Sequence, residues 1–203
     1  MNPKLIEQRF RRCLSTYDEF AQIQKIMAQK LVALIGKKEF SSILEIGCGT
    51  GVLTKECVKA FSFDRYLAND IVAECESFVK PLSSKINFSA GDITKLEIND
   101  KFDLIISNAV FQWFKEPRMI IKELQKCLNT EGTLIFSSFG SKNFYELKEI
   151  LGVGIDYPEY VENKLCDDLY ELEFSSVMEL LKHIKNTGVN AVQNYLLTKG
   201  DIK

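Results

Sequence analysis

The stretch that most constrains the fold is a short apolar strand that runs into three alternating glycines. Residues 42–46 read as the strand, Gly47, Gly49 and Gly51 follow it, and residues 52–58 have the pattern of a helix. Glycines at alternate positions leave backbone N–H groups open to a ligand. The helix N-terminus adds free donors and the positive end of its dipole. This order is typical of nucleotide-binding loops in general.

The spacing of the glycines and the acid before them narrow the kind of ligand. G-x-G-x-G differs from the G-x-G-x-x-G of dinucleotide enzymes and from the P-loop, and no lysine directly follows the last glycine. Glu45 ends the strand, and we expect its carboxylate at the mouth of the loop, where it would repel a pyrophosphate. A cationic or zwitterionic ligand is favoured. S-adenosylmethionine (SAM), with its sulfonium and ammonium groups, is one.

The segment from Glu45 to Gly51, E-I-G-C-G-T-G, resembles motif I of the class I SAM-dependent methyltransferases. The resemblance implies SAM as the cofactor, with contacts from Glu45, Gly47, Cys48, Gly49 and Gly51. The alternative is a glycine-rich turn with only a structural role.

Acids after the next two predicted strands extend the expected cofactor site. The strand at 65–70 ends in Asp70, about twenty residues beyond the glycines, where βαβ folds place a carboxylate for the ribose hydroxyls. A surface aspartate is the alternative. The strand at 86–90 leads to Asp92, expected at the adenine amino group, and to Ile93, expected against the ring.

Strands continue to alternate with helices beyond this point. The further elements are strands at 102–107 and 132–138 and helices at 73–80 and 116–128. This order predicts a doubly wound, mostly parallel α/β sheet. Ile71 and Asn108, which follow the second and fourth strands, complete the expected cofactor contacts.

A helix is also expected before the first strand. Apolar residues recur at helical spacing from Phe20 through Leu34 to Ile35, which predicts a helix that ends at Gly36 and packs against the sheet.

Beyond the fifth strand, Asn143 resembles the cap of a helix over 144–151. A strand is expected near 169–174. Ser175 or Ser176 is expected to cap a helix that runs to about Asn186 and ends at Gly188.

The length of 203 residues fits one domain. We expect a helical cap at 1–36, a SAM-binding core at 37–140 and a substrate-side region at 141–203.

Composition excludes some classes of function. Lys and Arg number 26 against 28 Asp and Glu, which argues against non-specific nucleic-acid binding. No apolar run approaches the roughly 20 residues that span a bilayer, and the N-terminus lacks the apolar core of a secretion signal. We therefore expect a cytoplasmic protein with no membrane or nucleic-acid partner.

Neither the cysteines nor the single histidine indicates a metal site. The six cysteines, at 13, 48, 57, 75, 127 and 166, show no C-x-x-C pair and are expected to be small buried apolar side chains. His183 lies in a predicted amphipathic helix, where a packing or surface role is favoured over metal binding.

Three stretches resemble one subfamily, the malonyl-acyl-carrier-protein O-methyltransferases of biotin synthesis. They are F-x6-Y-D-x-F-A from Phe10, S-N-x3-Q-W from Ser107, and F-S-S-F-G-S from Phe136, which is followed by the helix near His183. The resemblance implies methylation of the free carboxylate of malonyl-acyl carrier protein or malonyl-CoA. Another small acceptor, such as a quinone precursor or aconitate, and a SAM-binding protein without catalysis are the alternatives.

A carboxylate is already a nucleophile at neutral pH, so this reaction needs orientation and exclusion of water and no general base. Tyr17, Gln112 and Trp113 are the candidate catalytic residues, and a packing role for each is an equal alternative. Arg118 is a candidate for binding the substrate carboxylate. The basic N-terminal residues Lys4, Arg9, Arg11 and Arg12 fit either a solvated helix face or an acidic carrier protein.

The resemblance weakens at the C-terminus. The subfamily ends in an apolar strand, whereas only Tyr195, Leu196 and Leu197 remain as apolar material here. We expect either a truncated product or a sheet without its last strand, which would leave one edge open to pairing. The sequence does not indicate an oligomeric state.

Overall fold

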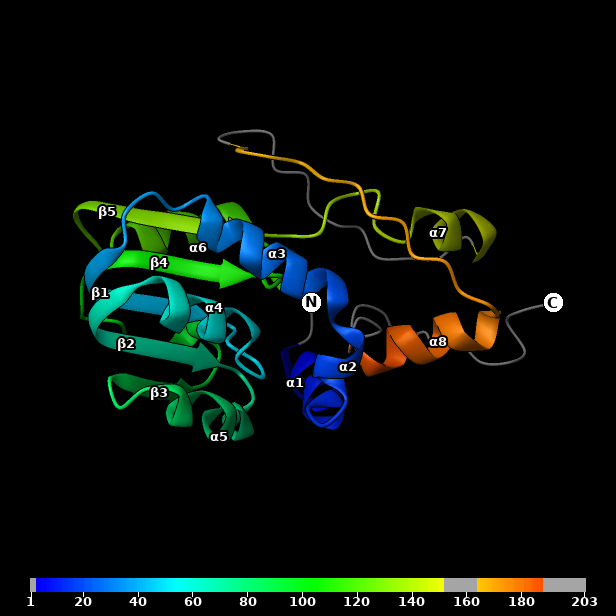
Figure 1. Ribbon diagram of the computed structural model, residues 1–203, viewed down its shortest axis with the longest axis horizontal. Coiled ribbons are helices and arrows are strands. Elements are labelled where there is room, and N and C mark those ends of the chain that lie inside the picture. Colours follow the sequence, from blue (N-terminus) through cyan, green and yellow to red (C-terminus); the bar gives the residue numbers. More distant parts are fainter. Residues whose placement is uncertain (1–2, 152–163, 188–203) are drawn as a thin grey trace. The chain divides into compact units, whose positions relative to one another are not determined.

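The computed structural model describes residues 3–151 and 164–187 (Figure 1). The chain forms two compact units. One spans residues 21–138 and is called the core unit; the other joins residues 2–20 to 139–203 and is called the terminal unit. The expected helical cap at 1–36 is thus divided between the units. The expected core boundary at 140 lies two residues after the core unit ends.

The core unit is built on a five-stranded sheet in the order β3-β2-β1-β4-β5. The strands are β1 (Glu39–Ile46), β2 (Ser62–Asp70), β3 (Ile86–Ala90), β4 (Phe102–Asn108) and β5 (Leu128–Ser137). Every neighbouring pair is parallel. The chain moves outward from β1 to β3 and then crosses to β4, so the strand order reverses between β1 and β4, where doubly wound folds bind ligands. The predicted doubly wound parallel sheet is confirmed. The expected loss of the last strand concerns residues outside the described ranges.

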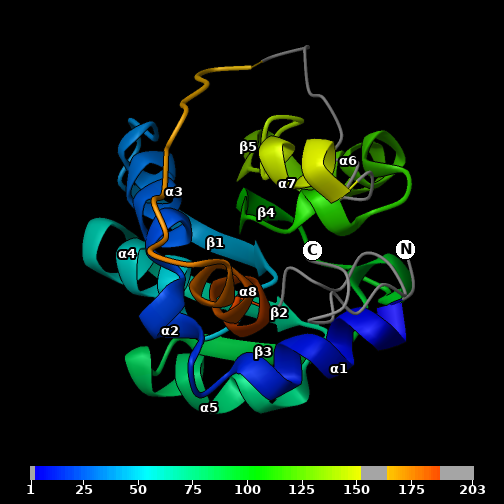
Figure 2. The ribbon, with the colours of Figure 1, turned by 90° about the vertical axis from the view of Figure 1, so that its right-hand side faces the viewer.

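Helices cover both faces of this sheet. Helices α3 (Gln22–Ala33) and α4 (Val52–Ala60) lie on one face and α6 (Pro117–Gln125) on the other, as the view onto the carboxyl ends of the strands shows (Figure 2). The central strands are therefore buried on both sides. Leu104, Ile105 and Ile106 of β4 are at most 1% exposed, as their nearly continuous apolar run predicts.

Three helices of the structure differ in their bounds or buried face from those predicted from the sequence. The face of α3 is rotated, since Leu34 is 46% exposed whereas Gln24 is buried, and the helix ends at Ala33 instead of Gly36. The helix expected at 73–80 is broken into α5 (Glu76–Val79) between two 3₁₀ turns, the second of which contains Pro81, a residue without a backbone donor. The helix expected to reach Leu128 ends at Gln125 because Leu128 already belongs to β5.

The described part of the terminal unit consists of four helices and of segments without regular structure, such as residues 164–174. It contains α1 (Pro3–Cys13), α2 (Tyr17–Phe20), α7 (Tyr145–Leu151) and α8 (Val177–Asn186). Helix α7 starts one residue later than predicted because Phe144 has φ = +54°, outside the helical region. The predicted cap of α8 is confirmed, since the Ser176 hydroxyl accepts the Glu179 N–H at 3.3 Å.

Two predictions for the terminal unit are wrong and one is confirmed. The strand expected at 169–174 is absent from these described residues; Leu169 is 65% exposed, so no sheet covers its apolar side chain. Cys166 is exposed, not buried. His183 has the expected packing role: its ring lies 5.3 Å from the Phe174 ring, and burial lowers its pKa.

No helix in the described ranges is long and apolar enough to cross a membrane.

The central strand offers a direct test of this core. Leu104→Ala removes a fully buried side chain and should lower the free energy of unfolding by about 2–5 kcal/mol. Met119→Ala on α6, where the side chain is 62% exposed, should change it by less than about 0.5 kcal/mol. Urea titration followed by circular dichroism measures both, and equal effects would contradict the burial of β4.

Candidate functional site

In the loop between β1 and α4, called the glycine loop, a side chain is unfavourable at Gly47 and at Gly49 for different reasons. Gly47, Gly49 and Gly51 all have positive φ, at +69°, +52° and +80°. A Cβ on Gly47 would lie 2.3 Å from Cγ2 of Val110, so packing alone excludes a side chain there. A Cβ on Gly49 would meet nothing within 4 Å. The backbone at Gly49 therefore borders open space that a side chain would occupy, as a ligand-binding loop requires.

The end of β2 holds this loop in place. The backbone oxygen of Asn69 accepts the N–H groups of Gly47 and Cys48 at 2.8 and 3.0 Å. Asp70 then accepts the Gly49 N–H on Oδ2 at 2.8 Å and the Val72 N–H on Oδ1 at 2.9 Å. Burial raises the pKa of Asp70, and these backbone hydrogen bonds oppose the rise. The Cys75 side chain and the Ile71 backbone also hydrogen-bond this carboxylate, so Asp70 lies at the centre of the contacts that join the end of β2 to the glycine loop.

The position of Glu45 differs from the sequence-based expectation. Its side chain is 0% exposed, so it lies beneath the loop and not at its mouth. Alternation along β1 points it to the α4 side of the sheet. There Oε2 accepts the hydroxyl groups of Thr54 and Tyr66, both at 2.6 Å. Oε1 is buried without a hydrogen-bond partner among the described residues.

The surroundings of Glu45 explain its titration. Burial raises the pKa of this carboxyl to about 7, the hydrogen bonds from Thr54 and Tyr66 oppose the rise, and the nearby Asp70 carboxylate adds to it. Thr54 and Tyr66 were not singled out from the sequence. In the sequence, the only feature that could have identified them was a polar group on the side of a helix or strand that faces the protein core.

The third loop of the site follows β3. The Gly91 N–H donates to the backbone oxygen of Asp70 at 2.8 Å, which fixes the start of this loop beside β2. Asp92 is 17% exposed, and its Oδ1 accepts the N–H and hydroxyl of Thr94 at 3.0 and 2.8 Å. Ile93 is buried, at 9% exposure, and Ile71 is half-buried. The structure thus places the expected adenosine contacts at the same edge of the sheet as the glycine loop.

The segment after β4 is more internal than expected. Asn108 donates from Nδ2 to the Gln24 oxygen at 2.9 Å and accepts the Ser137 hydroxyl at 2.5 Å. Gln112 is only 1% exposed; its Nε2 donates to the Ala109 oxygen at 2.7 Å and its Oε1 accepts the Ser138 hydroxyl at 3.3 Å. These contacts favour the packing alternative for Gln112.

The remaining candidates are less enclosed. Trp113 is half-buried in a 3₁₀ turn of the core unit, and Arg118 is exposed on α6. Tyr17 belongs to the terminal unit, where its ring lies 6.2 Å from that of Phe10. Its role in lining the acceptor site therefore stays a prediction.

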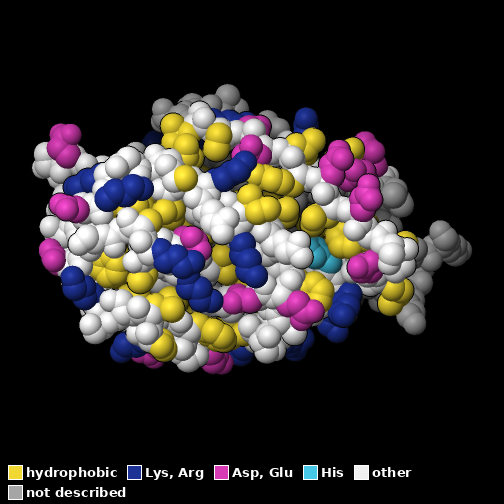
Figure 3. Space-filling view, viewed as in Figure 1, with side chains coloured by type: hydrophobic (Ala, Val, Ile, Leu, Met, Phe, Trp, Pro, Cys, Tyr) yellow, Lys and Arg dark blue, Asp and Glu magenta, His cyan; other side chains and the backbone are white. Residues whose placement is uncertain are grey.

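The surface that carries α3 and α4 has no dominant sign of charge. Basic and acidic side chains are interspersed with apolar ones on this face of the core unit (Figure 3). This distribution agrees with the near balance of charges in the sequence.

Comparison with known proteins gives matches over most of the chain. A family model described as "Methyltransferase domain" matches residues 6–186. The malonyl-[acyl-carrier protein] O-methyltransferase of Calditerrivibrio nitroreducens is 37% identical over an alignment that covers 95% of this chain and 82% of the relative. The enzyme of the same name from Chlorobium luteolum is 34% identical over 97% of this chain and 82% of its own length.

Solved structures agree on the fold. The N-methyltransferase NodS of Bradyrhizobium japonicum aligns with a TM-score of 0.54 at 24% identity, over 64% of this chain and 71% of its own.

The parallel sheet, its reversal between β1 and β4 and the glycine loop at that edge define a class I methyltransferase fold. The chain belongs to the methyltransferase domain family and to the family of the malonyl-[acyl-carrier protein] O-methyltransferases. Both resemblances expected from the sequence are confirmed.

The buried Glu45 predicts a specific pH dependence of stability. In the unfolded chain this carboxyl titrates near 4.5, but in the folded chain it keeps its proton up to about pH 7. The folded state therefore binds more protons in this window, and its stability should fall as the pH rises from about 5 to 8, by at most about 3 kcal/mol.

Glu45→Gln should flatten this dependence, because a neutral amide oxygen can still accept the two hydroxyl groups. Asp70, whose pKa is also raised, is present in both proteins, so the difference between their pH profiles reports Glu45 together with its interaction with Asp70. Urea denaturation of both proteins at pH 5, 6, 7 and 8 measures the change. Parallel pH profiles would show that Glu45 titrates in its ordinary range.

Proposed function

We propose that this protein transfers a methyl group from SAM to the free carboxylate of a malonyl thioester on acyl carrier protein, as a step of biotin synthesis. The observation that carries the proposal is 37% identity, over 95% of this chain and 82% of the relative, to a protein of that name. Malonyl-CoA is the alternative carrier of the same acyl group.

The residues at the carboxyl edge of the sheet fit SAM. Gly49 leaves open space where the ligand would approach the backbone. Asp70, at the end of β2 beside the glycine loop, is proposed to face the ribose hydroxyls, and Asp92 and Ile93 are proposed to face the adenine amino group and ring. The further contacts that we propose are Gly47, Cys48, Gly51, Ile71 and Asn108, whereas Glu45, which was expected from the sequence to touch the cofactor, is fully buried and acts only through its charge. When bound, SAM supplies an electrophilic methyl group on a sulfonium.

Charge also supports a cationic cofactor. Glu45 and Asp70 are two buried acids, and each has a pKa raised by burial. A positive group at the loop would stabilise their ionised forms, whereas a pyrophosphate would add like charge to them. The preference for a cationic ligand over a pyrophosphate, which the sequence suggested, therefore still holds. The charge of Glu45 acts from beneath the loop and not from its mouth.

The acceptor needs no base from this chain. The malonyl carboxylate is ionised at neutral pH, so the protein has to orient it and exclude water. Half-buried Trp113 remains a candidate wall of the acceptor site. We assign Gln112 a supporting role through Ala109 and Ser138, since its side chain is enclosed. Tyr17 is proposed to line the acceptor side.

The open space at Gly49 predicts how a single methyl group would affect binding. Gly49→Ala places a Cβ in that space at φ = +52° and should weaken SAM binding at least tenfold. The left-handed backbone alone should cost about 1–2 kcal/mol of stability. Gly36→Ala is the matched control, because Gly36 lacks a positive φ and its Cβ would also meet nothing within 4 Å. Calorimetric titration with SAM measures both; equal affinities would contradict the loop assignment.

The proposed reaction is tested with methyl-labelled SAM and malonyl-acyl carrier protein. Methyl-ester formation on the malonyl group, absent with acetyl-acyl carrier protein, is the expected result. Malonyl-CoA, free aconitate and a quinone precursor are assayed in parallel. Transfer only to one of the free acceptors would contradict the proposed substrate, and SAM binding without any transfer would favour a non-catalytic role.

A further inference from the structure

The covering of the sheet changes between its two faces at β1, β2 and β3. On one face α3 and α4 pack against the strands, whereas on the other the chain between β3 and β4 forms only a short 3₁₀ turn, Ile93–Lys95, and a loop. Beneath this loop is a cavity of about 120 Å³, large enough for several water molecules. The loop that carries Asp92 and Ile93 therefore has a gap between it and the sheet, although Ile93 itself is buried.

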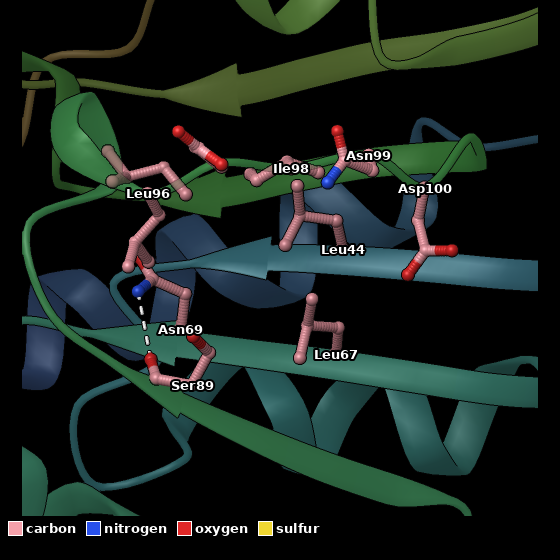
Figure 4. Close-up of a pocket in the computed structure, with 10 residues that line it drawn as sticks. Leu44, Leu67, Asn69, Ser89, Leu96, Ile98, Asn99 and Asp100 are labelled. Atoms are coloured by element: carbon pink, nitrogen blue, oxygen red, sulfur yellow. Dashed lines mark hydrogen bonds between the residues drawn. The ribbon is translucent and has the colours of Figure 1, made fainter.

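The lining of this cavity shows what the loop rests on. Leu44 and Leu67 form its floor on β1 and β2, and Leu96 and Ile98 come from the loop (Figure 4). Asn69 lines the same cavity from β2, with the same orientation as Leu67 because side chains alternate along a strand. It is the last residue of β2 to face the cavity before the chain reaches Asp70.

The hydrogen bonds of Asn69 join the two loops of the cofactor site. Its side-chain Nδ2 donates to the backbone oxygens of Ser89 at 2.9 Å and Gly91 at 3.0 Å. Its backbone oxygen accepts from Gly47 and Cys48 of the glycine loop. Asn69 is 3% exposed, so these bonds are shielded from bulk solvent. One residue thus connects the loop before α4 to the loop after β3.

We propose that Asn69 is a positioning residue for the adenine side of the cofactor site, which rests on the function proposed above. It fixes Gly91, and with it the neighbouring Asp92, at a set distance from the glycine loop across a poorly packed cavity. The Gly91 N–H is held by the Asp70 oxygen, and Asn69 adds the contact to the Gly91 oxygen that orients Asp92 toward the adenine amino group. A residue with a merely structural role would affect all ligands of the site alike.

The test compares S-adenosylhomocysteine with its 6-oxo analogue, S-inosylhomocysteine, by calorimetric titration of the full chain. The analogue lacks the amino group that would donate a hydrogen bond to Asp92, so the wild-type protein should bind it about tenfold more weakly. Asn69→Leu keeps the side-chain size but removes both donors. It should weaken S-adenosylhomocysteine about tenfold and bring the ratio of the two dissociation constants close to one.

Two further variants make the result interpretable. Asn87→Leu, an exposed asparagine of the neighbouring β3, is the matched control and should keep the wild-type ratio. Asn69→Ser, whose hydroxyl is too short to reach both oxygens, replaces Asn69→Leu if that variant does not fold by circular dichroism, and the same loss of ratio is expected.

An unchanged ratio in a folded Asn69 variant, with both ligands weakened equally, would reduce Asn69 to a structural role and overturn the inference. So would a wild-type protein that binds S-adenosylhomocysteine without discriminating between the two ligands. A wild-type protein that binds neither ligand would instead refute the proposed function, and the inference with it.

Discussion

The cofactor edge of the core unit depends on hydrogen bonds at the carboxyl end of β2. Asn69 and Asp70 accept backbone N–H groups of the glycine loop, and the backbone oxygen of Asp70 accepts the N–H of Gly91. Loops at the ends of parallel strands lack ladder partners of their own, so their positions are set by such contacts. Without this link the glycine loop and the loop after β3 would be two independent turns. With it they form one surface that can face a single ligand.

Beneath that surface the structure buries acidic groups instead of exposing them. Glu45 reaches only Thr54 and Tyr66, and its second oxygen has no partner among the described residues. A buried carboxyl with incomplete hydrogen bonding is costly to ionise, which explains why its pKa lies near neutrality. The arrangement is unfavourable for an anionic ligand and favourable for a cationic one. Charge selection at this edge can therefore arise without any direct contact between Glu45 and the ligand.

Much of this could be predicted from the sequence, and the failures have physical causes. The five strands, and the positions of Asp70 and Asp92 after the second and third of them, follow from apolar runs and from the residues that end each run. These are local signals. The orientation of Glu45 required knowing that Thr54 and Tyr66 would lie on its side of the sheet, which depends on the packing of α4. The enclosure of Gln112 depends in the same way on β5 through Ser138. The strand predicted at 169–174 is wrong because its apolar side chains, Leu169 and Leu172 among them, are exposed and no sheet of the described residues covers them, which depends on tertiary structure and not on the local pattern.

Hydrogen–deuterium exchange with and without S-adenosylhomocysteine tests the central claim most directly, because it reports the ligand-contacting loops without any substitution. If the end of β2 unites the two loops into one cofactor site, binding should slow exchange at residues 47–52 and also at 91–94. Amides in α6 and in α8 should be unchanged and serve as internal references. Protection of the glycine loop alone, or protection confined to other elements, would contradict a single site organised by Asn69 and Asp70.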